Sequence, residues 1–311
     1  MKATNSDNLF KRLLTYQKER FPLILNGIVI AVFTFSAISY SRICSGKTGF
    51  VDYKDYLFGF LVTLSLFLMV RIFDEFKDKE DDAKYRKYLP VPRGLIKLKT
   101  LKTIGIIVIA FQLAIVLIFQ LDMLYLYLIA MGYLGLMTVE FFVSDWLKKN
   151  QMIYILSHMF IMPLVDVYAS GIDWLLEGTT PSFGLVWFFL VSYFNGVVLE
   201  FGRKMKTVDM EEEGVVSYTK LYGTTKAPIY WMLFLAITYG FTLIASYYAN
   251  FDYKAYIIFT IVFLISIIPA ILFINKPTKK KAKMIEIASA FWTFLMYLLL
   301  GAIPMINQLM N

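Results

Sequence analysis

Long apolar runs separated by short polar segments occupy almost all of this chain of 311 residues. A bilayer hydrocarbon core about 30 Å thick is crossed by about 20 helical residues, and each run is close to that length. We therefore expect an all-α polytopic membrane protein in which residues 22–308 form one transmembrane domain. The pattern predicts nine transmembrane helices, at about residues 22–40, 56–73, 101–120, 122–142, 151–169, 184–201, 228–249, 255–275 and 286–308.

Basic residues are distributed very unevenly among the polar segments. If the runs alternate across the membrane, segment 1–21 and the loops on its side carry 25 of the 31 lysines and arginines, whereas the opposite loops carry four. Cytoplasmic loops are enriched in lysine and arginine, so we expect a cytoplasmic N-terminus and a C-terminus on the opposite side. In a bacterium the membrane would be the inner one. The same rule accounts for the net charge of +8, so the expected partner is the lipid bilayer and not nucleic acid.

The first of two acidic cytoplasmic loops, residues 74–100, follows the second predicted helix. Asp74, Asp78 and Asp82 recur every four residues, so they share one side if the helix continues beyond the membrane. Asp81 lies nearly as close to this stripe, so either Asp81 or Asp82 is its third member. The stripe predicts a Mg²⁺ site, because Mg²⁺ takes oxygen ligands and bridges carboxylates to substrate phosphates. The alternative is a solvated helix end in which acidic and basic residues pair at i,i+4.

The second acidic loop, residues 202–227, follows the sixth predicted helix. Asp209 and Glu213 repeat the spacing of four residues, and two such stripes on one membrane face predict a site for a diphosphate with its Mg²⁺ ions. Glu200, inside the membrane boundary, is a functional candidate by its position, with an ion pair to Lys204 as the alternative. The remaining phosphate charge would be bound by the neighbouring basic side chains Lys77, Arg86, Arg93, Arg203 and Lys204.

The helix count and the placing of the two acidic loops resemble the UbiA superfamily of intramembrane prenyltransferases. That family has nine transmembrane helices and aspartate-rich motifs after the second and sixth. Its first motif, Asn-Asp-x-x-Asp-x-x-x-Asp followed by Arg, Pro and Gly, is matched by Asp74, Glu75, Asp78 and Asp82, then Arg86, Pro90, Pro92, Arg93 and Gly94. Its second motif is matched in outline by Asp209, Glu213, Gly214, Thr219 and Gly223. Aspartate replaces asparagine at 74 and glutamate replaces aspartate at 75 and 213, so the chain resembles a divergent, bacterial-type member.

The resemblance implies a nine-helix bundle around a central cavity open to the cytoplasmic side, with the active site near that face. It also implies Mg²⁺-dependent transfer of a prenyl group from an isoprenyl diphosphate to an acceptor within the membrane. The sequence indicates neither the acceptor, which is aromatic or lipid, nor an oligomeric state. The implied catalytic and Mg²⁺-binding residues are Asp74, Asp78, Asp82, Asp209 and Glu213. Basic residues matched to the family outside the motifs are Arg20 and Lys148, and further candidates are Glu75, Asp81, Asn195, Glu200 and Tyr218.

Several other features bear on the chemistry. His158 and Cys44 are the only histidine and cysteine, so neither a histidine-ligated or thiolate metal centre nor an intrachain disulfide is expected. Glu140, near the cytoplasmic end of the fourth predicted helix, is a candidate base on the acceptor side. One alternative function is a UbiA-type terpene cyclase, which would ionise the same diphosphate and cyclise it without an acceptor. Another is a secondary transporter, which would be expected to show inverted repeats and broken midplane helices.

Overall fold

The computed structural model describes residues 7–310, in which the apolar runs are helical. Polar side chains at Asn8, Asp52, Ser217 and Thr278 cap the first turns of four helices by accepting hydrogen bonds from backbone N–H groups. The α-helices are α1 (Leu9–Arg20), α2 (Leu23–Cys44), α3 (Tyr53–Lys77), α4 (Lys79–Tyr85), α5 (Leu98–Phe119), α6 (Leu124–Thr138), α7 (Ser144–Lys149), α8 (Gln151–Met159), α9 (Ile161–Trp174), α10 (Gly184–Arg203), α11 (Tyr218–Tyr248), α12 (Tyr253–Asn275), α13 (Lys279–Tyr297) and α14 (Ile303–Met310).

Within residues 7–310, nine helical segments are long and apolar enough to cross a membrane, which confirms the predicted number and the all-α class. The fifth segment combines α8 and α9, and the ninth combines α13, a π-helical turn and α14. The prediction that the fourth helix reaches residue 142 is wrong, because α6 ends at Thr138. Residues 140–142 have positive φ angles, and a right-handed helix cannot continue through that conformation.

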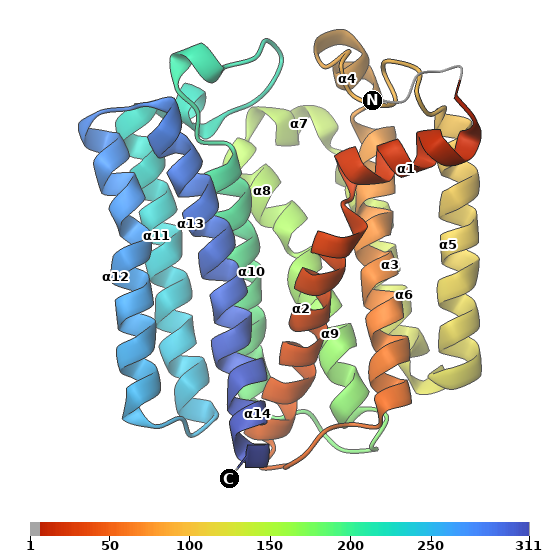
Figure 1. Ribbon diagram of the computed structural model, residues 1–311, viewed down its shortest axis with the longest axis vertical. Helices are drawn as coiled ribbons and strands as arrows, with labels where there is room; N and C mark the ends of the chain where they lie inside the picture. The colour runs from red at the N-terminus through yellow and green to blue at the C-terminus, as the bar shows by residue number, and fades with distance from the viewer. Residues whose placement is uncertain (1–6, 311) are drawn as a thin grey trace.

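α10 lies inside the bundle and packs against α9, α11, α13 and α2 (Figure 1). Large, fully buried side chains such as Trp231, Trp292 and Tyr40 fill the space between these helices. Gly301 permits a close approach of two backbones, since a Cβ atom there would overlap the backbone of Ser36 in α2. Close packing of this kind holds helices together in a bilayer, where lipid tails are as apolar as the side chains. The acidic loops follow α3 and α10. Both of these helices contact α9, which therefore holds them near each other.

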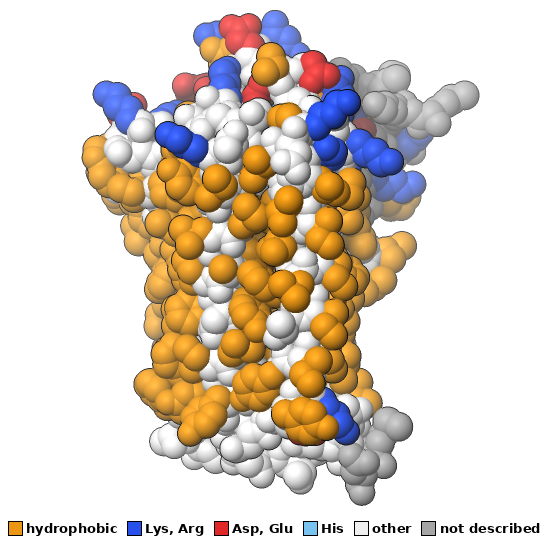
Figure 2. All heavy atoms as spheres, turned by 90° about the vertical axis from the view of Figure 1, so that its left-hand side faces the viewer, with side chains coloured by type: hydrophobic (Ala, Val, Ile, Leu, Met, Phe, Trp, Pro, Cys, Tyr) orange, Lys and Arg blue, Asp and Glu red, His pale blue; other side chains and the backbone are white. Residues whose placement is uncertain are grey.

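Charged side chains gather at one end of the molecule, and a broad band of hydrophobic side chains covers the helices below them (Figure 2). We call this the charged end; it is formed by α1, α4, α7 and the loops 86–97 and 204–217. α1 lies across it, whereas α14 lies at the opposite end of the bundle (Figure 1). An apolar band next to a charged end is the surface expected of a protein embedded in a bilayer.

A buried ion-pair network closes the end opposite the charged end. Asp173 in α9 is fully buried and accepts hydrogen bonds from Ser41 Oγ at 2.6 Å and Arg42 Nη1 at 2.9 Å. Lys47 Nζ donates to the same carboxylate at 3.0 Å. Arg42 and Lys47 also donate to Glu177, at 2.5 and 3.0 Å. The network therefore ties α2 and the loop after it to the end of α9.

Replacing Glu177 with glutamine is expected to make the protein less sensitive to acid. Burial raises the pKa of Glu177, but hydrogen bonds from Lys47 and Arg42 outweigh it and hold that pKa below its usual value. A lowered folded-state pKa contributes stability that is present above about pH 4.3 and is lost as the pH falls through the folded-state pKa. Because 39% of the Glu177 side chain is exposed, solvent screening limits this contribution to less than about 1 kcal/mol. Thermal unfolding from neutral to acidic pH measures it, and identical pH dependence in Glu177→Gln and the wild type would contradict the expectation.

Candidate active site

The first acidic loop begins as a helical continuation of α3. Only Asp78, with φ of -90° and ψ of 8°, separates α3 from α4, and two i→i−4 hydrogen bonds connect the helices across it. The N–H groups of Asp78 and Asp82 donate to the carbonyl oxygens of Asp74 and Asp78 at 2.9 and 2.8 Å. The expected continuation of this helix beyond the apolar run is therefore confirmed.

Asp74 and Asp78 share one cation. The Lys77 Nζ atom lies 3.5 Å from Asp74 Oδ1 and 3.8 Å from Asp78 Oδ1. The same ammonium donates to the hydroxyl of Tyr154 in α8 at 2.7 Å, and the Tyr154 ring stacks on His158 with centroids 4.0 Å apart. Burial raises the pKa of Asp78, and Lys77 opposes that rise. Sequence reasoning missed Tyr154, because one aromatic residue in an apolar run carries no distinguishing signal.

Asp81 and Asp82 have different surroundings. Asp82 is buried, and its Oδ1 accepts a hydrogen bond from Arg86 Nη1 at 3.1 Å; burial raises the pKa of Asp82 and Arg86 opposes the rise. Asp81 is exposed, with Oδ2 3.8 Å from Nζ of Lys148 in α7. An ideal helix turns by about 100° per residue, so Asp81 lies about 20° from Asp74 around the axis and Asp82 about 80°. The structure interrupts α3 and α4 at Asp78, so this ideal angle applies only to an uninterrupted helix.

Two of the basic candidates, Arg20 and Arg93, form salt bridges with acidic side chains, and each salt bridge includes a residue of α1. The carboxylate of Glu75, 1% exposed, accepts hydrogen bonds from Arg20 Nε at 2.7 Å and Arg71 Nη2 at 3.0 Å. Arg20 and Glu75, both candidates from sequence, therefore pair with each other and join α1 to α3. Arg93 donates from both terminal nitrogens to the carboxylate of Glu19, at 2.8 and 3.0 Å.

The candidates at the end of α10 also form internal contacts. Glu200 accepts hydrogen bonds from Arg203 Nη2 at 2.5 Å and lies 2.9 Å from Lys204 Nζ, so the ion pair considered from sequence is present. The Lys204 ammonium also lies 5.9 Å from the ring centroid of the buried Tyr218. Asn195 Oδ1 accepts a hydrogen bond from a buried tryptophan of α13 at 3.0 Å. The arrangement holds a cluster of charge at the boundary between the apolar band and the charged end.

Asp209 and Glu213 lie on the exposed rim of the charged end. A hydrogen bond from Thr207 and the Lys279 ammonium, 3.0 Å from Asp209 Oδ2, lower the pKa of Asp209. Across residues 7–310, no group of three or more histidine, cysteine, aspartate or glutamate side chains is placed to hold one metal ion. The carboxylates of the two loops therefore do not form a joint site in this structure.

The two acidic loops nevertheless touch through other residues. The Tyr88 hydroxyl donates to Glu212 Oε2 at 3.0 Å. Gly214, with φ of +69°, lies directly against the ring of Tyr85, where a Cβ atom would overlap the ring. Sequence reasoning missed Glu212 and both tyrosines, because their pairing joins segments more than a hundred residues apart.

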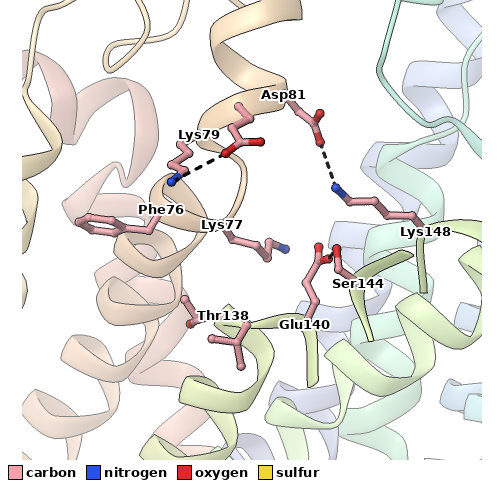
Figure 3. Close-up of a pocket in the computed structure, with 10 residues that line it drawn as sticks. Phe76, Lys77, Lys79, Asp81, Thr138, Glu140, Ser144 and Lys148 are labelled. Carbon is pink, nitrogen blue, oxygen red and sulfur yellow. Dashed lines mark hydrogen bonds and ion pairs between the residues drawn. The ribbon is translucent and has the colours of Figure 1, made fainter. Parts of the chain in front are cut away.

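A pocket of about 290 Å³ lies at the charged end, between α3–α4 and the segment from the end of α6 to α7. Its lining includes Lys77, Asp81, Lys148, Glu140 and Ser144. Figure 3 shows Lys77 and Lys148 reaching into this space from different walls, with Glu140 and Ser144 paired on the side of Lys148. The pocket therefore brings together candidates from the first acidic loop, the fourth span and the loop that follows it.

A family model described as the UbiA prenyltransferase family matches residues 31–295, which include both acidic loops. The chain belongs to this family. A solved structure of digeranylgeranylglyceryl phosphate synthase has a similar fold, with a TM-score of 0.60 and 19% sequence identity over 94% of this chain and 99% of the other. No curated protein matches the chain significantly.

For this UbiA family member, Asp74 and Asp78 are the candidates best placed to hold Mg²⁺. Each side chain is 35% exposed, and the Lys77 ammonium between them shows that the pair accommodates positive charge. Mg²⁺ is usually bound by one or two carboxylates together with waters and substrate phosphates, so these two carboxylates fit that requirement. Asp209 and Glu213 would have to move inward from the rim to join them.

Proposed function

We propose that this protein transfers a prenyl group from an isoprenyl diphosphate to an acceptor within the membrane, in a Mg²⁺-dependent reaction. The observation that carries the proposal is the Asp74–Asp78 pair with Lys77, at the boundary between the apolar band and the charged end. An isoprenyl diphosphate has the same two halves, an apolar tail and a multiply charged head. The bundle offers apolar surroundings to the tail, and the charged end offers counter-ions to the head.

Within this site, Asp74 and Asp78 would hold Mg²⁺, with waters and phosphate oxygens completing its coordination. When bound, Mg²⁺ neutralises charge on the diphosphate and makes it a better leaving group. Lys77 and Lys148 would bind other diphosphate oxygens. The Tyr154 hydroxyl accepts a hydrogen bond from Lys77 at 2.7 Å, and the face of its ring would stabilise an allylic carbocation by about 0.5–2 kcal/mol.

The other candidates fit the same proposal in two roles. The basic residues would exchange their present salt-bridge partners for diphosphate oxygens when substrate binds; these are Arg20, Arg86, Arg93, Arg203 and Lys204. The acidic residues would supply further negative charge for Mg²⁺; these are Asp81, Asp82, Asp209 and Glu213.

The charged end is proposed to face the cytoplasm. The loops at this end carry most of the lysines and arginines, and cytoplasmic loops are enriched in these residues. The N-terminal helix α1 and the active site would then be cytoplasmic, with α14 at the other face. In a bacterial cell the protein would reside in the inner membrane.

Mass spectrometry of the reaction products tests the proposed function. Purified protein would receive isoprenyl diphosphates of increasing length, with a hydroxybenzoic acid, an alkyl hydroquinone or an alkyl glycerol as acceptor. We expect an acceptor adduct that carries the prenyl group, one diphosphate released per adduct, and loss of both when Mg²⁺ is chelated. A cyclic hydrocarbon or alcohol formed equally well without acceptor would instead establish a terpene cyclase.

A further inference from the structure

The turn between α6 and α7 has a strained backbone. Glu140, Phe141 and Phe142 have φ angles of 48°, 53° and 61°. A residue other than glycine in this left-handed region costs about 1–2 kcal/mol, and such strain persists only where surrounding contacts fix it. Phe141 supplies those contacts by packing edge-on against Tyr133 and His158, with centroid distances of 5.4 and 5.6 Å. Strain that is fixed in this way is typical of functional sites.

The strained turn directs Glu140 into the pocket. Phe142 is 81% exposed, whereas Glu140 is only 7% exposed and accepts a hydrogen bond on Oε2 from Ser144 Oγ. Burying a carboxylate costs free energy unless it is hydrogen-bonded or paired with a cation. Ser144 satisfies one oxygen, so Oε1 is the oxygen available to a molecule in the pocket.

Glu140 faces the proposed diphosphate site across this pocket (Figure 3). Tyr154, which accepts a hydrogen bond from Lys77, also lies close enough to Glu140 to interact with it electrostatically. Phe76 and Val139 give the pocket an apolar part beside its charged groups. The space of about 290 Å³ therefore suits an amphipathic molecule lying between Lys77 and Glu140.

We propose that this pocket binds the prenyl acceptor, that the acceptor is an amphipathic alcohol or phenol, and that Glu140 takes its hydroxyl proton. This assignment rests on the proposed prenyl transfer and adds the acceptor class to it. The acceptor oxygen forms a bond to C1 of the prenyl group as the C1–O bond to the diphosphate breaks. The bonding electron pair leaves with the diphosphate, and the hydroxyl proton moves to Glu140. Ser144 is a positioning residue that orients the carboxylate.

The variant Glu140→Gln tests the assignment. Glutamine keeps the size of the side chain but cannot accept the proton, so formation of the prenyl ether should fall by about 100-fold or more. Release of diphosphate by slow solvolysis with water should continue in the variant, because the Asp74–Asp78 pair is unaffected. The control is Asp145→Asn, which alters an exposed carboxylate on α7 outside the pocket and should leave transfer unchanged.

Three outcomes of this experiment overturn the assignment. Ether formation by Glu140→Gln at the wild-type rate would show that Glu140 takes no proton. An equal loss of transfer with acceptor and of solvolytic diphosphate release measured without acceptor would place Glu140 on the donor side. A product with the prenyl group on carbon would exclude proton removal from a hydroxyl. If the wild type forms no adduct, the proposed prenyl transfer itself is overturned. Measuring the wild type therefore separates failure of that proposal from failure of the Glu140 assignment.

A labelling measurement tests the pocket without using activity. Thr138 lines the pocket, so Thr138→Cys in a Cys44→Ser background should react with a maleimide. The hydroxybenzoic acid, the alkyl hydroquinone and the alkyl glycerol should each slow this labelling severalfold. Their methyl ethers, which lack the hydroxyl, should slow it less. Lys149→Cys, at an exposed position outside the pocket, should be unaffected. Equal protection of both cysteines, or of neither, would overturn acceptor binding at this site.

Discussion

Replacing Asp78 with alanine is expected to reduce Mg²⁺-dependent release of diphosphate by at least about 100-fold. The substitution removes one of the two carboxylates that share the Lys77 ammonium and that are best placed to hold Mg²⁺. The fold should survive, because Lys77 keeps its contacts with Asp74 and with the Tyr154 hydroxyl. Burial raises the pKa of Asp78, so its ionised carboxylate is not a source of stability that the variant would lose.

Diphosphate release should be measured over a range of Mg²⁺ concentrations in Asp78→Ala, the wild type and a matched control. Asp145→Ala is that control, since it removes an exposed carboxylate at the same end of the molecule. Membrane insertion and the thermal unfolding midpoint should be the same in all three proteins. Retention of wild-type activity by Asp78→Ala, at every Mg²⁺ concentration, would remove Asp78 from the site.

The sequence predicts best those features that depend on residues close together in the chain. The length of each apolar run determines whether it crosses the membrane, and all nine helices follow from this. The spacing of four residues likewise predicts that Asp74 and Asp78 lie on one side of a helix, where they share Lys77. The end of α6 was not predictable in this way, because Glu140 to Phe142 contain no glycine or asparagine to indicate a left-handed turn.

Contacts between distant segments determine the rest of the candidate site. Arg20 meets Glu75 across 55 positions of sequence, and Lys77 meets Tyr154 across 77. A single sequence contains no signal for which of several arginines reaches a given carboxylate. For this reason the sequence predicts diphosphate binding for Arg20 and gives Glu75 only as a further candidate, whereas the structure pairs the two.

Replacing Glu75 with alanine is expected to cost about 3 kcal/mol of unfolding free energy. The carboxylate is 1% exposed and accepts hydrogen bonds from Arg20, Arg71 and the buried Tyr16, at 2.7, 3.0 and 3.4 Å. Its removal leaves two guanidinium groups close together and largely shielded from water, with 14% and 19% of their side chains exposed. A buried charge that loses its partner is strongly destabilising, because neither water nor another side chain replaces the lost attraction.

Glu19→Ala is the matched control, since it removes a carboxylate of α1 from a more exposed pair with Arg93. An exposed pair is worth less than about 1 kcal/mol, so this variant should unfold near the wild-type temperature. Unfolding midpoints should be compared together with the Mg²⁺ concentration that gives half-maximal diphosphate release. A structural role for Glu75 predicts a large loss of stability and unchanged Mg²⁺ dependence in the molecules that remain folded. Normal stability with a raised Mg²⁺ requirement would contradict this and would make Glu75 a metal ligand, as its position in the family motif suggests.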